Sequence, residues 1–358
     1  DSINGIKAGY AAGMKVIHIP DTIEINDDIR RLTSVVCHSL SDVPDIIDTW
    51  NEGKIADVEG YYENAKINRV YVDRVHVKKA FAEYTAAYNA DDPKIKLKID
   101  HTYRVAALCE RIAKAAGMCA YDVELAWLSG MLHDVGRFEQ IKRYNTFSDA
   151  DSVDHAKFGA DLLFKDGLIS TFLNGMVKCT GYKPGALEDR YSSDGVFLYD
   201  RLNKSDMEML ELAIRCHNMY RIPQGLNRRE QAFCNVLRDA DKVDIFKVNI
   251  DTPLEEIYNT TTEELMKSDI TDEVLEAFDE EHCILKAIRR TPADTVIGHV
   301  SLAYELVYDE SVRITVEQGY LAKLMHFHSD NEETNRKMAM VREKMDSYVK
   351  KRIGEKDA

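Results

Sequence analysis

The stretch L-A-W-L-S-G-M-L-H-D-V-G-R, residues 125–137, carries the clearest indication of the fold and the chemistry of this chain. Its apolar residues predict a buried helix that presents His133 and Asp134 in its last turn, with Gly136 just beyond. A carboxylate in so apolar a helix is costly unless something pairs with it. Imidazole and carboxylate both bind divalent ions, so a metal is the expected partner. One helix cannot complete a coordination sphere, because neighbouring side chains diverge by about a hundred degrees.

Four other positions between residues 101 and 241 turn an imidazole or a carboxylate toward the apolar face of a predicted helix. They are His101, His155, His217 and Asp241. A lone histidine on an apolar face is most often an ordinary core residue. Several inward histidines and two inward aspartates, however, would leave many polar groups to satisfy in one small core. Their joint occurrence therefore predicts metal binding.

The chain of 358 residues exceeds what one hydrophobic core usually supports, and its periodicity is mainly helical. The fold class is predicted as mainly α, a helical bundle with additional C-terminal helices and a small α/β segment at the N-terminus. The predicted domains are an α/β segment over residues 1–52, a polar linker over 53–68, a helical metal-binding domain over 69–250 and a helical extension over 251–358. Within the metal-binding domain, residues 138–149 and 180–199 are expected to be loops.

Composition narrows the classes of function. The formal net charge of −15 argues against general nucleic-acid binding, which needs a basic face. No apolar run approaches the length of a membrane span, so no membrane association is expected. The 7 cysteines form no CxxC pair, and Cys109, Cys216 and Cys234 lie in apolar helical patterns. These features indicate reduced thiols and a cytoplasmic location.

The N-terminal segment D-S-I-N-G-I-K-A-G-Y-A-A-G-M-K-V-I-H-I-P-D is followed by a second strand signal near residues 34–39, which together form a βαβ-type pattern. The segment resembles the C-terminal end of haloacid-dehalogenase-type phosphatases. The resemblance implies that Asp1 occupies a magnesium-binding position. The nucleophilic aspartate and the lysine of that family have no counterpart in this chain. The segment is therefore expected to be a packed remnant, although an upstream catalytic part of the native gene remains an alternative.

The order His, His-Asp, His, His, Asp on consecutive helices resembles the HD superfamily of metal-dependent phosphohydrolases. The resemblance is carried by I-D-H-T-Y-R-V-A, L-S-G-M-L-H-D-V-G-R-F, S-V-D-H-A-K-F-G-A, A-I-R-C-H-N and L-R-D-A-D-K-V-D-I-F. It implies that His101, His133, Asp134 and Asp241 bind one ion. His155 and His217 match the branches with two metals, in which Asp134 bridges the pair. Asn218 stands where another branch often has a further histidine, so a third ion is not expected.

The ligand types suit manganese, iron, nickel or cobalt, with magnesium as a further candidate. Two such ions ionise water near neutral pH and neutralise phosphoryl charge, so hydrolysis of a phosphomonoester or phosphodiester is expected. Arg137 is the leading candidate for a contact with phosphate, and Lys98 and Asn218 are weaker ones. The expected substrate is a nucleotide or another small phosphorylated metabolite. The alternative is a non-catalytic, metal-stabilised module that binds a nucleotide. The C-terminal helices are expected either to cap the pocket or to pair two subunits.

Overall fold

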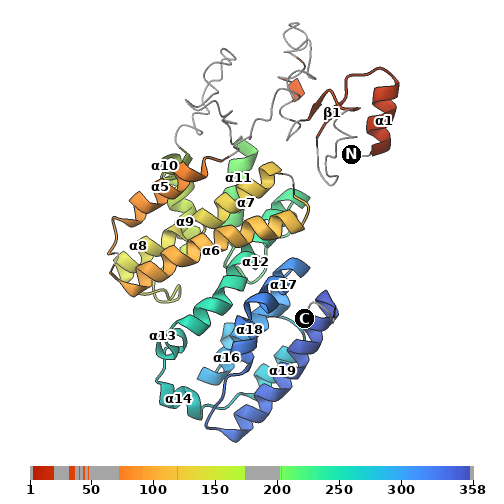
Figure 1. Ribbon diagram of the computed structural model, residues 1–358. Helices are drawn as coiled ribbons and strands as arrows, with labels where there is room; N and C mark the ends of the chain where they lie inside the picture. The colour runs from red at the N-terminus through yellow and green to blue at the C-terminus, as the bar shows by residue number, and fades with distance from the viewer. Residues whose placement is uncertain are drawn as a thin grey trace.

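The computed structural model describes residues 3–19, 32–36, 40, 43–44, 47, 72–89, 91–118, 120–173, 202 and 204–354. This part of the chain is mostly helical, which confirms the predicted class (Figure 1). Among the described helices, none has both the length and the apolar character needed to cross a lipid bilayer. The predicted linker over 53–68, the predicted loop over 180–199 and Asp1 lie outside the described residues.

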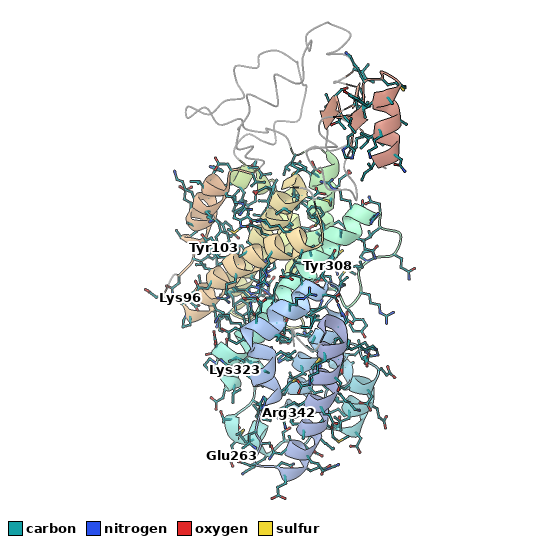
Figure 2. All side chains as sticks on the ribbon, turned by 45° about the vertical axis from the view of Figure 1, so that its right-hand side comes forward. Lys96, Tyr103, Glu263, Tyr308, Lys323 and Arg342 are labelled. Carbon is teal, nitrogen blue, oxygen red and sulfur yellow. The ribbon has the colours of Figure 1, made fainter. Side chains whose placement is uncertain are left out.

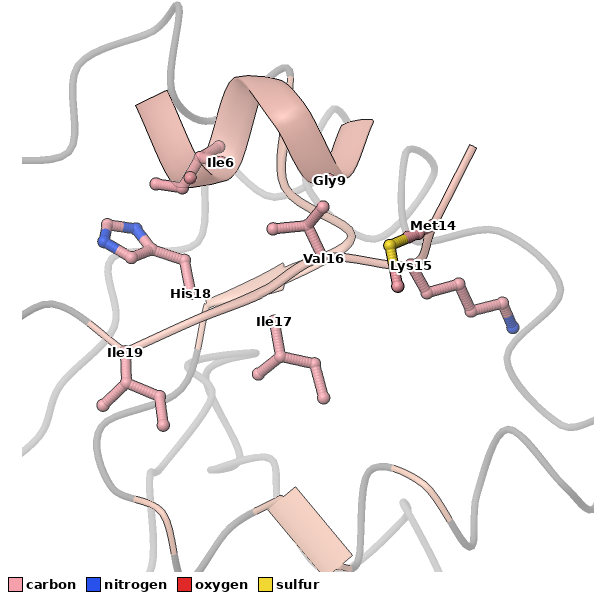
Figure 3. Close-up of a pocket in the computed structure, with 9 residues that line it drawn as sticks. Ile6, Gly9, Met14, Lys15, Val16, Ile17, His18 and Ile19 are labelled. Carbon is pink, nitrogen blue, oxygen red and sulfur yellow. The ribbon is translucent and has the colours of Figure 1, made fainter. Parts of the chain in front are cut away.

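The N-terminal segment combines one helix with two short parallel strands. Helix α1 (Ile3–Ala11) ends before Gly13, whose φ of +67° favours glycine, and leads into β1 (Ile17–His18). Strand β1 pairs in parallel with β2 (Val35–Val36), as the βαβ-type pattern predicts. A cavity of about 350 Å³ lies between α1 and β1. In Figure 3, Val16 and His18 face the helix, while Ile17 points to the opposite side of the strand.

The expected metal-binding domain is a group of helices that packs around one apolar core. Its elements are α5 (Arg74–Thr85), α6 (Pro93–Ala115), α7 (Ala120–Leu132), α8 (Val135–Tyr144), α9 (His155–Ala160) with a π-helical turn at Asp161–Lys165, α10 (Ile169–Leu173), α11 (Lys204–Cys216) and α12 (Arg228–Asp251). Helix α6 begins at Pro93, because the Asp92 side chain accepts a hydrogen bond from the Lys94 amide and proline fits the first turn. Cys109, Cys216 and Cys234 are buried free thiols, as predicted.

The predicted helix over residues 125–137 is two helices rather than one. Helix α7 ends at Leu132, and Asp134 leaves the helical conformation at the start of α8. Gly136 does not terminate the helix; it lies in the first turn of α8. A Cβ atom there would lie 2.6 Å from the His155 carbonyl oxygen, so glycine permits α8 to approach α9. The prediction of a loop over 138–149 is therefore wrong as far as Tyr144, and the connecting loop covers residues 145–154.

The C-terminal extension is helical, as predicted. Its elements are α13 (Leu254–Tyr258), α14 (Thr262–Lys267), α15 (Asp272–Asp279), a 3-10 turn at Lys286–Ile288, α16 (Pro292–Val300), a 3-10 turn at Ser301–Glu305, α17 (Asp309–Gln318), α18 (Tyr320–Met325) and α19 (Glu332–Ile353). Helices α17 and α18 are separated at Gly319, which adopts a φ of +69°. A chain that turns this way packs both short helices against α12.

Helix α12 joins the two groups of helices (Figure 1). It packs against α6, α7 and α11 at one side and against α17 and α18 at the other. The buried Asp239 carboxylate accepts hydrogen bonds from the backbone amides of Val307 and Tyr308 and from the Ser311 hydroxyl. Figure 2 shows Tyr308 at this junction. The helix that carries Asp241 is therefore fixed to the C-terminal extension within one turn of that residue.

Candidate metal centre

The six predicted ligands come together where six helices meet, in or directly beside α6, α7, α8, α9, α11 and α12. His101 lies in α6, His133 and Asp134 connect α7 to α8, and His155 opens α9. His217 directly follows α11, and Asp241 lies in α12. All six are buried or largely buried, since even the most exposed, Asp241, leaves only 15% of its side chain accessible.

Asp134 lies between two groups of donor atoms. In one group, His101, His133 and Asp134 each offer a donor atom, and these atoms lie within 4.8 Å of one another. Asp241 joins this group, because its Oδ1 lies 3.2 Å from Nε2 of His101. In the other group, donor atoms of Asp134, His155 and His217 also lie within 4.8 Å of one another. Two ion positions that share one carboxylate fit this arrangement.

Each ligand histidine has its Nδ1 atom against an acceptor. Nδ1 of His133 faces the Gly130 carbonyl oxygen at 2.8 Å, and Nδ1 of His217 faces the Ile214 carbonyl oxygen at 2.7 Å. Nδ1 of His101 lies 2.6 Å from Oδ2 of Asp244, and Nδ1 of His155 lies 2.6 Å from Oδ2 of Asp149. A neutral imidazole with its proton on Nδ1 has a lone pair on Nε2. The acceptors therefore direct the Nε2 atoms of all four rings into the centre, and each Nε2 carries a lone pair when its imidazole is neutral.

A cation between the facing Nε2 atoms would satisfy them. The Nε2 atoms of His101 and His133 are 3.3 Å apart, and those of His155 and His217 are 3.1 Å apart. When both imidazoles of a pair are neutral with the proton on Nδ1, their two Nε2 lone pairs cannot form a hydrogen bond with each other. The Asp134 Oδ1 atom is also buried and has no hydrogen-bond partner. Unsatisfied acceptors of this kind fit divalent ions, whose ligands are neutral imidazoles and ionised carboxylates.

The protonation states agree with a ligand role. Burial lowers the pKa of His155 and His217 to about 4 and also lowers the pKa of His133, so these imidazoles are neutral at neutral pH. Burial by itself would raise the pKa of Asp134, but the charge of Lys98 and the nearby His133 and Arg137 hold it well below its usual range. His101 differs, because hydrogen bonds with Asp241 and Asp244 outweigh its burial and raise its pKa.

The three predicted phosphate contacts have different surroundings. The Lys98 ammonium donates a hydrogen bond to Oδ2 of Asp134 at 2.7 Å, so it lies at the centre. Arg137 lies with its Nε atom 3.7 Å from Oδ1 of Asp134, while its NH1 group donates to Gln140, Phe147 and Asp149. Asn218 is exposed and donates to Asp154 and Asp149, and thus lies on the side of the centre that holds His155.

The sequence analysis did not predict the two acidic residues that contact the Nδ1 atoms of His101 and His155. Asp244 is buried, and its carboxylate accepts hydrogen bonds from Arg104 at 2.6 and 2.9 Å as well as facing His101. Asp149 lies in the loop before α9. A signal existed for Asp244, because it follows Asp241 by three residues and thus shares its side of α12. No comparable periodicity marks Asp149, since a loop has none.

Comparison of this chain with known protein families agrees with this geometry. The family model of the HD domain matches residues 99–249, a span that contains all six candidate ligands. The match supports the HD superfamily for this part of the chain, and HD domains are generally metal-dependent hydrolases. The comparison with curated proteins found no match, and the comparison with solved structures found none either. The match does not extend to the N-terminal segment.

Proposed function

We propose that this chain is a two-metal phosphohydrolase that acts on a nucleotide or another small phosphorylated metabolite. The observation that carries the proposal is the shared carboxylate of Asp134, which has one donor group on each side. His101, His133 and Asp241 would hold one ion with Asp134. His155 and His217 would hold the other. Manganese, iron, nickel, cobalt and magnesium are the candidates that this mixture of nitrogen and oxygen donors suits.

When bound, two divalent ions make water a nucleophile near neutral pH and offset the charge of a phosphoryl group. The residues of the chain supply the surroundings for that chemistry. Lys98 and Arg137 place two positive charges beside Asp134, where a phosphoryl group would need donors. The Phe147 ring lies 5.4 Å from the Lys98 ammonium and 5.6 Å from the Arg137 guanidinium. We infer that the 145–154 loop forms one wall of the substrate pocket.

A small substrate fits the charge of the whole chain better than a polynucleotide does. The formal net charge of −15 repels an extended phosphate backbone, whereas a single phosphorylated metabolite needs only the local charge of Lys98 and Arg137. The resemblance of residues 1–52 to haloacid-dehalogenase-type phosphatases stays a prediction. The proposed activity does not depend on it, because all six ligands lie between residues 101 and 241.

The test combines metal analysis with a screen for phosphate release. The purified chain should contain divalent ions that a chelator removes, and it should release phosphate or a nucleoside monophosphate from some member of a panel of nucleotides and sugar phosphates when manganese is restored. Asp134→Ala should abolish both the metal content and the turnover, because both ion positions share this residue. Turnover that persists in Asp134→Ala would reject the assignment. Metal and nucleotide binding without turnover would favour the regulatory module instead.

A further inference from the structure

The two halves of the centre are supported by different kinds of side chain. Two of the four histidines, His133 and His217, have their Nδ1 atoms against carbonyl oxygens that lie three residues earlier in the chain. The other two have carboxylates there: Asp244 for His101 and Asp149 for His155. Each half of the centre therefore contains one histidine with a carboxylate partner and one with a carbonyl partner.

The two carboxylates differ in how they are held. Asp244 is fully buried on α12 and is bound at both oxygens by the Arg104 guanidinium. Asp149 lies in the loop between α8 and α9, and its side chain is 32% exposed. Besides the His155 ring, its carboxylate accepts hydrogen bonds from Arg137, Gln140 and Asn218. One half of the centre thus depends on a rigid helix pair, and the other half depends on a loop.

A buried amide fixes that loop. The Gln140 side chain is fully buried and donates to Asp149, to the Ser152 hydroxyl and to the Val153 carbonyl oxygen. Its own carbonyl oxygen accepts a hydrogen bond from Arg137 at 2.8 Å. Breaking such a network leaves several buried polar groups unsatisfied. Gln140 therefore holds Asp149 at a defined place relative to both Arg137 and His155.

We propose that Asp149 is the positioning residue of the ion position formed by Asp134, His155 and His217, and that it couples this position to Arg137. Its Oδ2 atom holds the His155 ring with Nε2 toward the ion, while its Oδ1 atom accepts from the Arg137 NH1 group at 3.0 Å. A carboxylate behind a ligand histidine fixes the tautomer and increases ligand basicity. The inference rests on the proposed two-metal function and assigns the second position to the 145–154 loop.

The experiment is a titration of the chelator-treated full chain with Mn²⁺ by equilibrium dialysis, which reads ion number and affinity without any substrate. The wild-type chain should bind two ions. Asp149→Asn should keep one ion at wild-type affinity and bind the other about 10- to 100-fold more weakly. Asp244→Asn should weaken the opposite position. Asp151→Asn removes the same charge from an exposed site in the same loop and should leave both affinities unchanged.

The outcomes separate this inference from the proposed function. A wild-type chain that binds no Mn²⁺ would overturn both. Two ions bound with unchanged affinity by Asp149→Asn, or an equal loss at both positions, would overturn the role of Asp149 alone. Far-UV circular dichroism checks that each variant is folded. If Asp149→Asn loses its helical signal, Asp149→Glu replaces it; a smaller loss confined to one position is then expected, because the longer side chain displaces the acceptor from Nδ1 of His155.

Discussion

At the scale of single residues, each buried histidine of the candidate centre has its Nδ1 atom against an acceptor of the protein and its Nε2 atom directed into the centre. Residues outside the centre show what happens without such a partner. His299, in α16, has a buried Nδ1 atom with no hydrogen-bond partner, and its ring packs against Tyr258 at 5.6 Å. Burial, together with the charges of Arg289 and Lys286, lowers the pKa of His299 to about 3. This residue is therefore neutral in the folded chain across the physiological range.

The lowered pKa of His299 makes folding stability depend on pH. In the unfolded chain the pKa returns to 6.5, so between about pH 6.5 and pH 3 the unfolded state binds the extra proton. The free energy of unfolding should therefore fall as the pH decreases through this range. Between pH 7.5 and pH 5.0 the contribution of His299 is roughly 1–2 kcal/mol. Urea unfolding of the wild-type chain and of His299→Phe at both pH values measures this contribution. The loss of unfolding free energy between pH 7.5 and pH 5.0 should be smaller in His299→Phe by roughly 1–2 kcal/mol, since all other groups titrate alike in the two proteins. An identical pH dependence of the two proteins would contradict it.

At the scale of elements, the break between α7 and α8 sets the relative positions of Asp134 and His155 in the candidate metal centre. Asp134 stands at the break, and the first turn of α8 must approach the start of α9 closely enough to bring His155 to the same carboxylate. Gly136 makes this approach possible, and Gly159 of α9 lies opposite, with its backbone nitrogen 2.7 Å from where a Cβ atom of residue 136 would be. The atoms that this Cβ atom would meet all belong to the backbone of α9, so no flexible side chain can move aside.

Gly136→Ala should therefore push α8 and α9 apart. Overpacking of this kind costs about 1–3 kcal/mol of stability. It should also displace His155, so that the affinity for Mn²⁺ falls at one ion position more than at the other. Thermal unfolding and Mn²⁺ dialysis measure the two effects. Lys142→Ala, on the exposed face of the same helix, is the control and should change neither. Wild-type stability in Gly136→Ala would show that α8 and α9 are less tightly apposed than the structure has them.

At the scale of the whole molecule, α12 is the element that both groups of helices share. Its Asp239 carboxylate binds the start of α17, and its Arg238 guanidinium lies 3.7 Å from Glu305 and donates to the Tyr220 carbonyl oxygen. Asp241 and Asp244, on the same helix, face His101. The position of the first group of ligands is thus connected through one rigid helix to the C-terminal extension.

Asp239→Ala tests this junction. The change leaves the amides of Val307 and Tyr308 without their acceptor, which should cost roughly 1–3 kcal/mol. We expect a lower urea midpoint and faster proteolysis between α16 and α17. Asp251→Ala, at the exposed end of α12, removes only an ion pair with Lys247 and should change stability by less than about 0.5 kcal/mol. Equal midpoints for the two variants would argue against a junction at Asp239.

The sequence by itself determined the mainly helical class and indicated the six candidate ligands, because both depend on local patterns. Apolar periodicity identified the inward histidines. Only the tertiary structure decided which groups contact the Nδ1 atoms of those histidines and hold them in place. Asp149 and Gln140 lie in or beside a loop, where no periodicity shows which way a side chain points. The division of residues 125–137 into two helices was likewise decided by packing, because Gly136 marks a close approach between α8 and α9 that local sequence does not distinguish from a helix end.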